Sequence, residues 1–272
     1  MKNKKVILVG SAGYLNKAGL GSYIDEFDIV WRTNFTGHPH TIESYPEIVG
    51  SKYGNWFIHA IQWGGFKFKN NKFINVFKNI NKYDKIILNG NEIELKQCNI
   101  VNPSFVKNVD PNTSLNLYRF VDKSKIFREQ LNKNIKYDNV FKSNFNNVYL
   151  LYFNAMKDCY TMLDNYNINL LKPPIQKPSS GLRILTYLLK KYEHIHLVGF
   201  DKGVSGNFLY HQNIYDRLNS LGVGLRNQKN HNITKKENNT GKKSDGRIAK
   251  HHLSAEYEFL DKLQKQGRIT IV

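Results

Sequence analysis

The chain has 272 residues, 40% of them hydrophobic, which is enough to bury one sizeable core. Its longest apolar runs, such as residues 5–10, are too short to span a bilayer or to act as a signal peptide, so we interpret that run as a buried strand. The two cysteines, Cys98 and Cys159, are too few for a disulfide framework or a structural zinc site, and they fit a reducing compartment.

The formal charge is +18, from 40 lysines and arginines against 22 aspartates and glutamates. Three explanations compete: the composition of an AT-rich genome, attraction to an anionic membrane surface or an anionic substrate, and nucleic-acid binding. The basic residues are spread thinly along the chain and no aromatic-rich RNA-binding motif is present. This distribution disfavours nucleic acid as the partner.

Apolar periodicity and turn residues predict alternating strands and helices along the chain. The predicted strands cover residues 5–10, 28–31, 54–59, 85–89, 148–151, 194–199 and 268–272. The predicted helices cover residues 11–24, 123–135, 154–165 and 180–191, and a final helix starts near Ser254 as its N-cap. This alternation predicts one α/β, Rossmann-like domain over residues 1–272, with a mainly parallel sheet and helices on both faces.

Residues 225–250 differ from the rest of the chain. They are rich in Lys and Asn, poor in apolar residues, and contain Gly241 and Gly246. This composition predicts a mobile loop. Two interpretations stay open: a surface insertion, or a lid over a site, since ordered sequence resumes directly after it.

The segment Pro178-Ser179-Ser180-Gly181 precedes the helix predicted at 180–191. Free backbone N–H groups and serine hydroxyls at the start of a helix suit an anion such as a phosphate or a carboxylate. Serine before a helix is also an ordinary N-cap, so this segment alone does not establish a binding site.

Four segments in order resemble the motifs of the sialyltransferase family that carries the sialylmotifs. The large motif is matched by Val9-Gly10-Ser11-Ala12-Gly13-Tyr14-Leu15, then Gly19, Gly21, Ile24-Asp25, Arg32-Thr33-Asn34 and residues 48–52. The small motif is matched by residues 178–200, the third motif by 207–211, and the very small motif by His251 with Glu256 five residues later. Each match alone is weak, and their order and spacing carry the resemblance.

Two departures from the family pattern are informative. Ser11 and Tyr14 stand where the large motif usually has Asn, which leaves open whether the donor sugar is sialic acid or a relative. Both cysteines lie outside the motifs, so the disulfide that joins the large and small motifs in secretory members is absent. The resemblance therefore implies a bacterial-type, cytoplasmic member.

The resemblance implies a GT-A-like fold variant and an inverting transfer of sialic acid from CMP-sialic acid to a hydroxyl of a glycan or glycolipid acceptor. Such an enzyme would decorate a surface polysaccharide or lipooligosaccharide, at the cytoplasmic side of the inner membrane. No Asp-x-Asp pair is present, which agrees with a metal-independent reaction without a cofactor. The alternatives are the same chemistry with CMP-Kdo or another CMP-activated acid sugar, or a non-catalytic basic Rossmann-like module that binds nucleotide or nucleic acid.

For the donor, the resemblance implies binding by the turn Gly10, Ser11, Ala12 and Gly13, and by Asn34, whose amide offers both a donor and an acceptor. Ser179, Ser180 and Gly181 would bind the carboxylate or phosphate of the donor at the helix N-terminus.

For the chemistry, His251 is the predicted general base, because a neutral imidazole suits proton removal near neutral pH. The adjacent His252 is an alternative, since only the spacing to Glu256 selects His251. His211 would hydrogen-bond the leaving phosphate, with Tyr210 as a lesser candidate. Glu256 is predicted to be structural.

Overall fold

The computed structural model describes residues 4–59, 81–89, 148–150, 152–168, 178–201 and 252–272. The strands are β1 (Val6–Val9), β2 (Ile29–Thr33), β3 (Asn55–His59), β4 (Lys85–Asn89), β5 (Val148–Leu150), β6 (Ile195–Val198) and β7 (Ile269–Ile271). The helices are α1 (Leu15–Ala18), α2 (Gly21–Asp25), η1 (a 3₁₀ turn, Asn34–Gly37), α3 (Pro39–Ser44), α4 (Pro46–Val49), α9 (Tyr152–Asn165), α10 (Ser180–Leu189) and α13 (Leu253–Lys265).

The seven strands form one sheet in the order β5-β4-β3-β2-β1-β6-β7, and every neighbouring pair is parallel. The central strand β1 pairs with β2 on one side and with β6 on the other, and all four of its residues are buried. A strand covered on both faces in this way reads as a continuous apolar run. The predicted α/β class and parallel sheet are confirmed.

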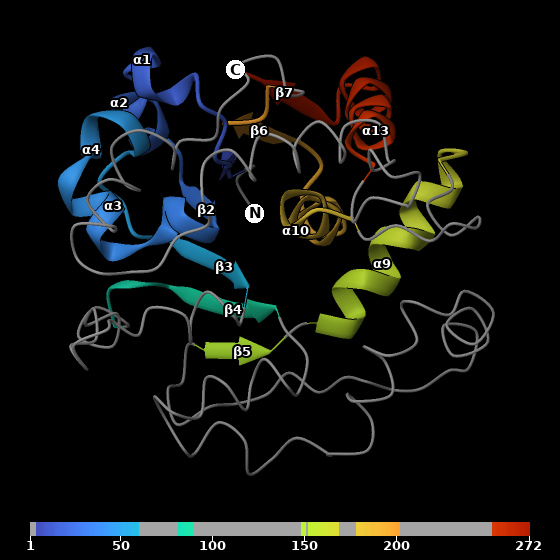
Figure 1. The fold of residues 1–272 in the computed structure, drawn as a ribbon, viewed down its shortest axis with the longest axis horizontal. Helices are drawn as coiled ribbons and strands as arrows, with labels where there is room; N and C mark the ends of the chain where they lie inside the picture. Colours follow the sequence, from blue (N-terminus) through green and yellow to red (C-terminus); the bar gives the residue numbers. More distant parts are fainter. Residues whose placement is uncertain (1–3, 60–80, 90–147, 151, 169–177, 202–251) are drawn as a thin grey trace, which may run out of the picture.

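Helices cover both faces of the sheet (Figure 1). Val6 and Leu8 of β1 pack in the core cluster that includes residues of α9, α10 and α13. Ile7 and Val9, which alternate with them, pack on the opposite face in the cluster that contains Leu15, Ile24 and Val49 of the short N-terminal helices. The pleat of a strand sends successive side chains to opposite faces, so one apolar run serves two cores.

The local predictions needed three corrections. The helix predicted at 11–24 is two short helices, because Gly19 adopts φ of 58° and ends α1. Residues 34–49, for which no element was predicted, form η1, α3 and α4. The final helix begins at Leu253 with His252 at the N-cap position, so Ser254 lies within the first turn and is not the cap. The helix predicted at 123–135 lies outside the described residues.

The strand order has a switch point between β1 and β6. From β1 to β5 the chain adds strands in one direction, and it then returns to place β6 and β7 on the other side of β1. In open parallel sheets, ligands bind outside the carboxyl ends of the strands at such a point. A ligand is therefore expected to bind at the loops that follow β1 and β6. Within the described part of the chain, no helix is both long and apolar enough to cross a membrane.

Candidate functional site

The loop after β1 is fastened to the end of β6. The N–H of Gly10 donates to the carbonyl of Val198 over 2.6 Å, and the N–H of Ala12 donates to the carbonyl of Gly199 over 3.0 Å. Ala12 is buried, whereas Ser11 and Gly13 are half-buried. The N–H groups of Gly10 and Ala12 are therefore occupied by the end of β6.

Glycine at position 10 is required by close contact. A Cβ there would lie 2.5 Å from the carbonyl oxygen of Gly199 and 2.7 Å from the ring of Phe200. Gly199 itself adopts φ of 78°, a conformation that glycine takes without strain. The carboxyl ends of β1 and β6 therefore approach one another backbone to backbone.

Phe200 joins this loop to the first turn of α10. A Cβ on Gly181 would lie 2.9 Å from the same Phe200 ring that excludes a side chain from Gly10. The structure thus brings together two predicted binding segments, Gly10–Gly13 and Ser179–Gly181, through one aromatic ring. The sequence contained Phe200 at the end of the small-motif match, but no pattern assigned it this position.

The backbone donors at the start of α10 can be accounted for one by one. The N–H of Leu182 donates to Ser179 Oγ over 3.2 Å, so Ser179 is the N-cap. The N–H of Arg183 donates to the Ser179 carbonyl, and the N–H of Ser179 donates to Glu256 Oε1 over 2.7 Å. Among the described residues, none accepts a hydrogen bond from the N–H of Ser180 or Gly181. These two groups are placed to bind an anion.

Glu256 is buried in the first turn of α13, with 4% of its surface exposed. Burial raises the pKa of its carboxyl to about 7, against the opposing effect of hydrogen bonds from Ser179 and of the Arg183 charge. In a capping box the acceptor for the N-cap N–H comes from the same helix, whereas here α13 supplies it for α10. This contact agrees with the structural role predicted for Glu256.

Asn34 lies at the carboxyl end of β2, next to β1 in the sheet. Its φ of 48° is left-handed, a region that Asn tolerates better than most residues. Thr36, two residues later, donates from Oγ1 to the carbonyl of Val9 over 3.0 Å. The turn that carries Asn34 is therefore tied to the end of β1, directly before the Gly10 loop.

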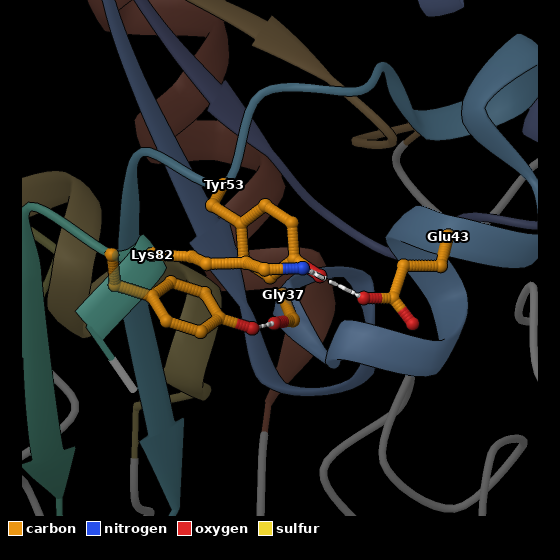
Figure 2. Close-up of polar contacts among 5 residues, drawn as sticks. Gly37, Glu43, Tyr53 and Lys82 are labelled. Atoms are coloured by element: carbon orange, nitrogen blue, oxygen red, sulfur yellow. Dashed lines mark hydrogen bonds and ion pairs between the residues drawn. The ribbon is translucent and has the colours of Figure 1, made fainter. Parts of the chain in front are cut away.

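Two aromatic side chains hold the ends of this turn. Trp56 Nε1 donates to the carbonyl of Asn34 over 2.5 Å. The hydroxyl of Tyr83 donates to the carbonyl of Gly37, which is labelled in Figure 2. The Trp56 and Tyr83 rings stack with their centroids 5.3 Å apart. Burial raises the pKa of Tyr83, so its hydroxyl keeps the proton it donates. The Asn34 backbone is thus held rigidly in place.

An exposed group of side chains supports the Tyr83 ring from outside. Tyr53 packs edge-on against Tyr83 with centroids 4.9 Å apart, and its hydroxyl donates to the carboxylate of Glu43 (Figure 2). Lys82 Nζ lies 3.3 Å from Glu43 Oε1 and 5.0 Å from the centre of the Tyr53 ring. These contacts connect α3 to the segments that precede β3 and β4.

Other residues of the large-motif match are structural. Arg32 is buried and donates to the carbonyls of Thr36, Val49, Gly50 and Lys52. Burial lowers its pKa to about 10, so it stays charged near neutral pH.

Asp25 accepts hydrogen bonds from the backbone N–H groups of Ser51 and Lys52 and from the Ser51 hydroxyl. Burial pushes the pKa of Asp25 upward, but these hydrogen bonds outweigh it and lower that pKa. Asp25 and Arg32 together fix the polypeptide around residues 49–52.

Tyr14 stands where the family's large motif usually has Asn. Its hydroxyl accepts the N–H of Gly199 over 2.8 Å and donates to the carbonyl of Val272. Burial raises the pKa of Tyr14, and the nearby charge of Asp201 raises it further. In this chain Tyr14 therefore links the ends of β6 and β7.

Several predicted residues lie outside the described part of the chain. They are the predicted base His251, the phosphate ligands Tyr210 and His211, and the predicted loop at 225–250. Their assignments stay predictions. His252 is described; it is half-buried at the N-cap position of α13 and makes no side-chain capping hydrogen bond.

No cluster of three or more His, Cys, Asp or Glu side chains that could hold a metal ion occurs among the described residues. Cys159 is a buried free thiol, and burial raises its pKa. Cys98 lies outside the described part of the chain.

Comparison with known proteins gave matches only among solved structures. No family model matches the chain, and no curated protein matches it. The chain is similar to the crystal structure of a mammalian sialyltransferase, with a TM-score of 0.48, 14% identity, and coverage of 100% of this chain and 70% of that one. It is also similar to a mammalian sialyltransferase in complex with Gal-β-1-3GalNAc-ortho-nitrophenol, with a TM-score of 0.46 and the same identity and coverage.

Proposed function

We propose that this chain is an inverting glycosyltransferase that moves sialic acid from CMP-sialic acid to a hydroxyl of a glycan acceptor. One observation carries the proposal. Three segments far apart in the sequence, the Gly10–Gly13 loop, Asn34 and the Ser179–Gly181 turn, meet at the carboxyl edge of the sheet beside its switch point. These are the segments for which the motif resemblance implies donor binding.

The groups at this edge suit the parts of a CMP-activated acid sugar. The N–H groups of Ser180 and Gly181 at the positive end of α10 suit its phosphate or carboxylate. The amide of Asn34 suits cytosine or ribose, since it can donate and accept together. The Gly10–Gly13 loop allows the nucleotide to approach the backbone closely.

The resemblance assigns the remaining steps to residues outside the described part of the chain. In the proposal, His251 removes the proton of the acceptor hydroxyl, and His211 donates a hydrogen bond to the departing phosphate, supported by Tyr210. A CMP donor carries a single phosphate, which has less charge to neutralise than a diphosphate. We therefore propose a metal-independent reaction.

The proposed setting is the cytoplasmic side of a bacterial inner membrane. The net charge of +18 would hold the protein near anionic lipid headgroups, where an acceptor glycolipid is made. A surface polysaccharide or lipooligosaccharide is the proposed acceptor class.

Two alternatives make different predictions. CMP-Kdo carries the same CMP group and the same kind of acid sugar, so the described site suits it equally, and only a donor comparison separates the two. A basic binding module would bind nucleic acid with an affinity that falls steeply with salt, and it would not respond to CMP.

The deciding experiment measures CMP release from CMP-sialic acid and, in parallel, from CMP-Kdo. It uses a panel of galactose-terminated acceptors with EDTA present. Acceptor-dependent release from one donor would support the proposal and identify the sugar. Loss of release in EDTA that magnesium restores would contradict the metal-independent reaction. No release from either donor, together with no thermal stabilisation by CMP, would overturn the proposal.

A further inference from the structure

We infer that Arg183 is a positioning residue that orients the Ser180 hydroxyl so that it donates a hydrogen bond to the anionic group of the donor substrate. This inference rests on the proposed function and adds a residue that neither the motif pattern nor the resemblance singled out. It concerns the first turn of α10, where Arg183 follows the Ser179–Gly181 segment.

Arg183 is buried in the first turn of α10. Only 6% of its surface is exposed. The apolar residues Leu182, Ile184 and Leu185 of α10 are buried beside it. A charged group is kept in such surroundings only where hydrogen bonds and an opposite charge offset its lost hydration. The Arg183 charge acts on the buried carboxyl of Glu256, whose pKa it lowers.

Arg183 donates two hydrogen bonds to the residues at the start of α10. Arg183 Nη2 donates to Ser180 Oγ over 3.2 Å, and Arg183 Nε donates to the Ser179 carbonyl over 3.4 Å. A guanidinium has five N–H donors and no acceptor. Ser180 Oγ must therefore act as the acceptor in its contact with Arg183, and its own hydrogen is left to donate elsewhere.

The Ser180 hydroxyl lies beside two backbone donors at the start of α10. Ser180 and Gly181 are half-buried, so the start of the helix is accessible, and their N–H groups have no acceptor among the described residues. The Ser180 hydroxyl adds a third donor to these two. Three donors at one helix start match an anion with several oxygens, such as a phosphate monoester or diester or a carboxylate. A CMP-activated acid sugar carries both a phosphate and a carboxylate.

The test is a double-mutant cycle with Ser180→Ala and Arg183→Met, read out by equilibrium binding of cytidine, CMP and the CMP-sugar that the release assay identifies. Each single variant should weaken anion binding by about tenfold or more, because Ser180→Ala removes a donor to a charged ligand and Arg183→Met removes the contact that orients that donor. Cytidine, which has no anionic group, should bind equally to all variants. Arg183→Met should add less than about twofold in the Ser180→Ala background, since its effect passes through the Ser180 hydroxyl.

The ligand series distinguishes the two sources of anion. Weakened binding of CMP places the phosphate at the start of α10. Weakened binding of the CMP-sugar alone, with CMP unaffected, places the sugar carboxylate there. Both results support the inference. Unchanged binding of both ligands, or fully additive effects of the two substitutions, would overturn it.

Arg268→Met is the matched control. Arg268 donates to the carbonyls of Leu189, Tyr192 and Glu193, at the other end of α10, so its loss should lower stability without changing the affinity for CMP. If Arg183→Met does not fold, Arg183→Lys replaces it in the cycle. A lysine keeps the positive charge but lacks the planar guanidinium. It should restore part of the CMP affinity in the protein that keeps Ser180, and none in the Ser180→Ala variant.

Failure of the inference is distinguishable from failure of the proposed function. If the unmodified protein releases no CMP and binds none, the proposed function fails and the inference fails with it. If the unmodified protein binds CMP and the cycle is additive, only the role of Arg183 is wrong.

Discussion

Glu256 on α13 accepts a hydrogen bond from the backbone N–H of Ser179 on α10, with 2.7 Å between Oε1 and N. The contact joins the helix that follows His251 and His252 to the helix whose first turn is the proposed anion site. Two motif segments separated by 77 residues are thereby held together by one buried carboxyl group. The protonation state of Glu256 therefore bears directly on the start of α10.

Glu256 should make the stability of the protein depend on pH. Its pKa rises from 4.5 when unfolded to about 7 in the fold. A raised pKa means that the folded protein holds the proton more tightly, so the stabilisation is fully present below pH 4.5 and is lost as the pH rises through about 7. The size of this term is about 3 kcal/mol between the two limits.

Glu256→Gln should remove this dependence, because an amide does not titrate but can still accept the Ser179 N–H. The measurement is the free energy of unfolding in urea from pH 5 to pH 8. The difference between the unmodified protein and the variant should fall by about 2–3 kcal/mol across that range. Glu258→Gln, at an exposed position on the same helix, is the control and should give a constant difference. A constant difference for Glu256→Gln would contradict the buried carboxyl.

Phe200 should determine how well substitutions of two glycines are tolerated. Gly181→Ala places a methyl group against the Phe200 ring alone, so it should lower stability by about 1–3 kcal/mol, and Phe200→Leu should restore part of the loss. Gly10→Ala also meets the Gly199 carbonyl, so Phe200→Leu should not rescue it. Urea unfolding of the single and double variants gives the comparison. Equal rescue of both glycine variants would show that the Gly199 carbonyl does not matter.

Asn34 should have separable effects on stability and on binding. Asn34→Gly keeps the left-handed backbone and removes the amide, so the affinity for CMP should fall by about tenfold. Asn34→Ala should in addition lower stability by about 1 kcal/mol, because alanine resists a positive φ. Asn167→Gly, at another positive φ and far from the site in the sequence, is the control and should bind CMP normally. Normal CMP binding by Asn34→Gly would remove Asn34 from the donor site.

His251 and His252 should differ in their effect on turnover. His251→Ala should lower the transfer rate by about 10²–10⁴-fold and leave CMP binding largely intact, as expected for a general base. His252→Ala should keep most of the rate, since His252 makes no side-chain cap bond at the start of α13. Initial rates and CMP affinities of the two variants decide. If His252→Ala is inactive and His251→Ala is active, the general base is His252 and not His251.

Most of the sheet could be predicted from local sequence. The strands at 28–31, 54–59 and 85–89 were predicted within two residues of β2, β3 and β4, because buried parallel strands are short apolar runs bounded by Gly, Asp or Asn. The short elements between residues 34 and 49 were missed. Their geometry depends on contacts with distant partners, chiefly the four backbone carbonyls that receive Arg32 and the aromatic pair Trp56 and Tyr83.

The residues of the candidate site also include some that were predicted and one that was missed. The Gly10 loop and Asn34 were predicted from the motif resemblance, and the Ser179–Gly181 turn was predicted from that resemblance together with the serine N-cap pattern. Arg183 was missed, since an arginine in the first turn of a helix gives no sign in the sequence that it will be buried.

The sequence by itself determined the class of the fold, the positions of its strands to within two residues at each end, and the segments with the chemistry to bind an anion. Only the tertiary structure decided that Phe200 lies between Gly10 and Gly181, and that Glu256 and Arg183 share the start of α10. The reason is physical: strand and turn preferences act over a few neighbouring residues, whereas burial and the pKa of Glu256 depend on which distant elements the sheet order brings together.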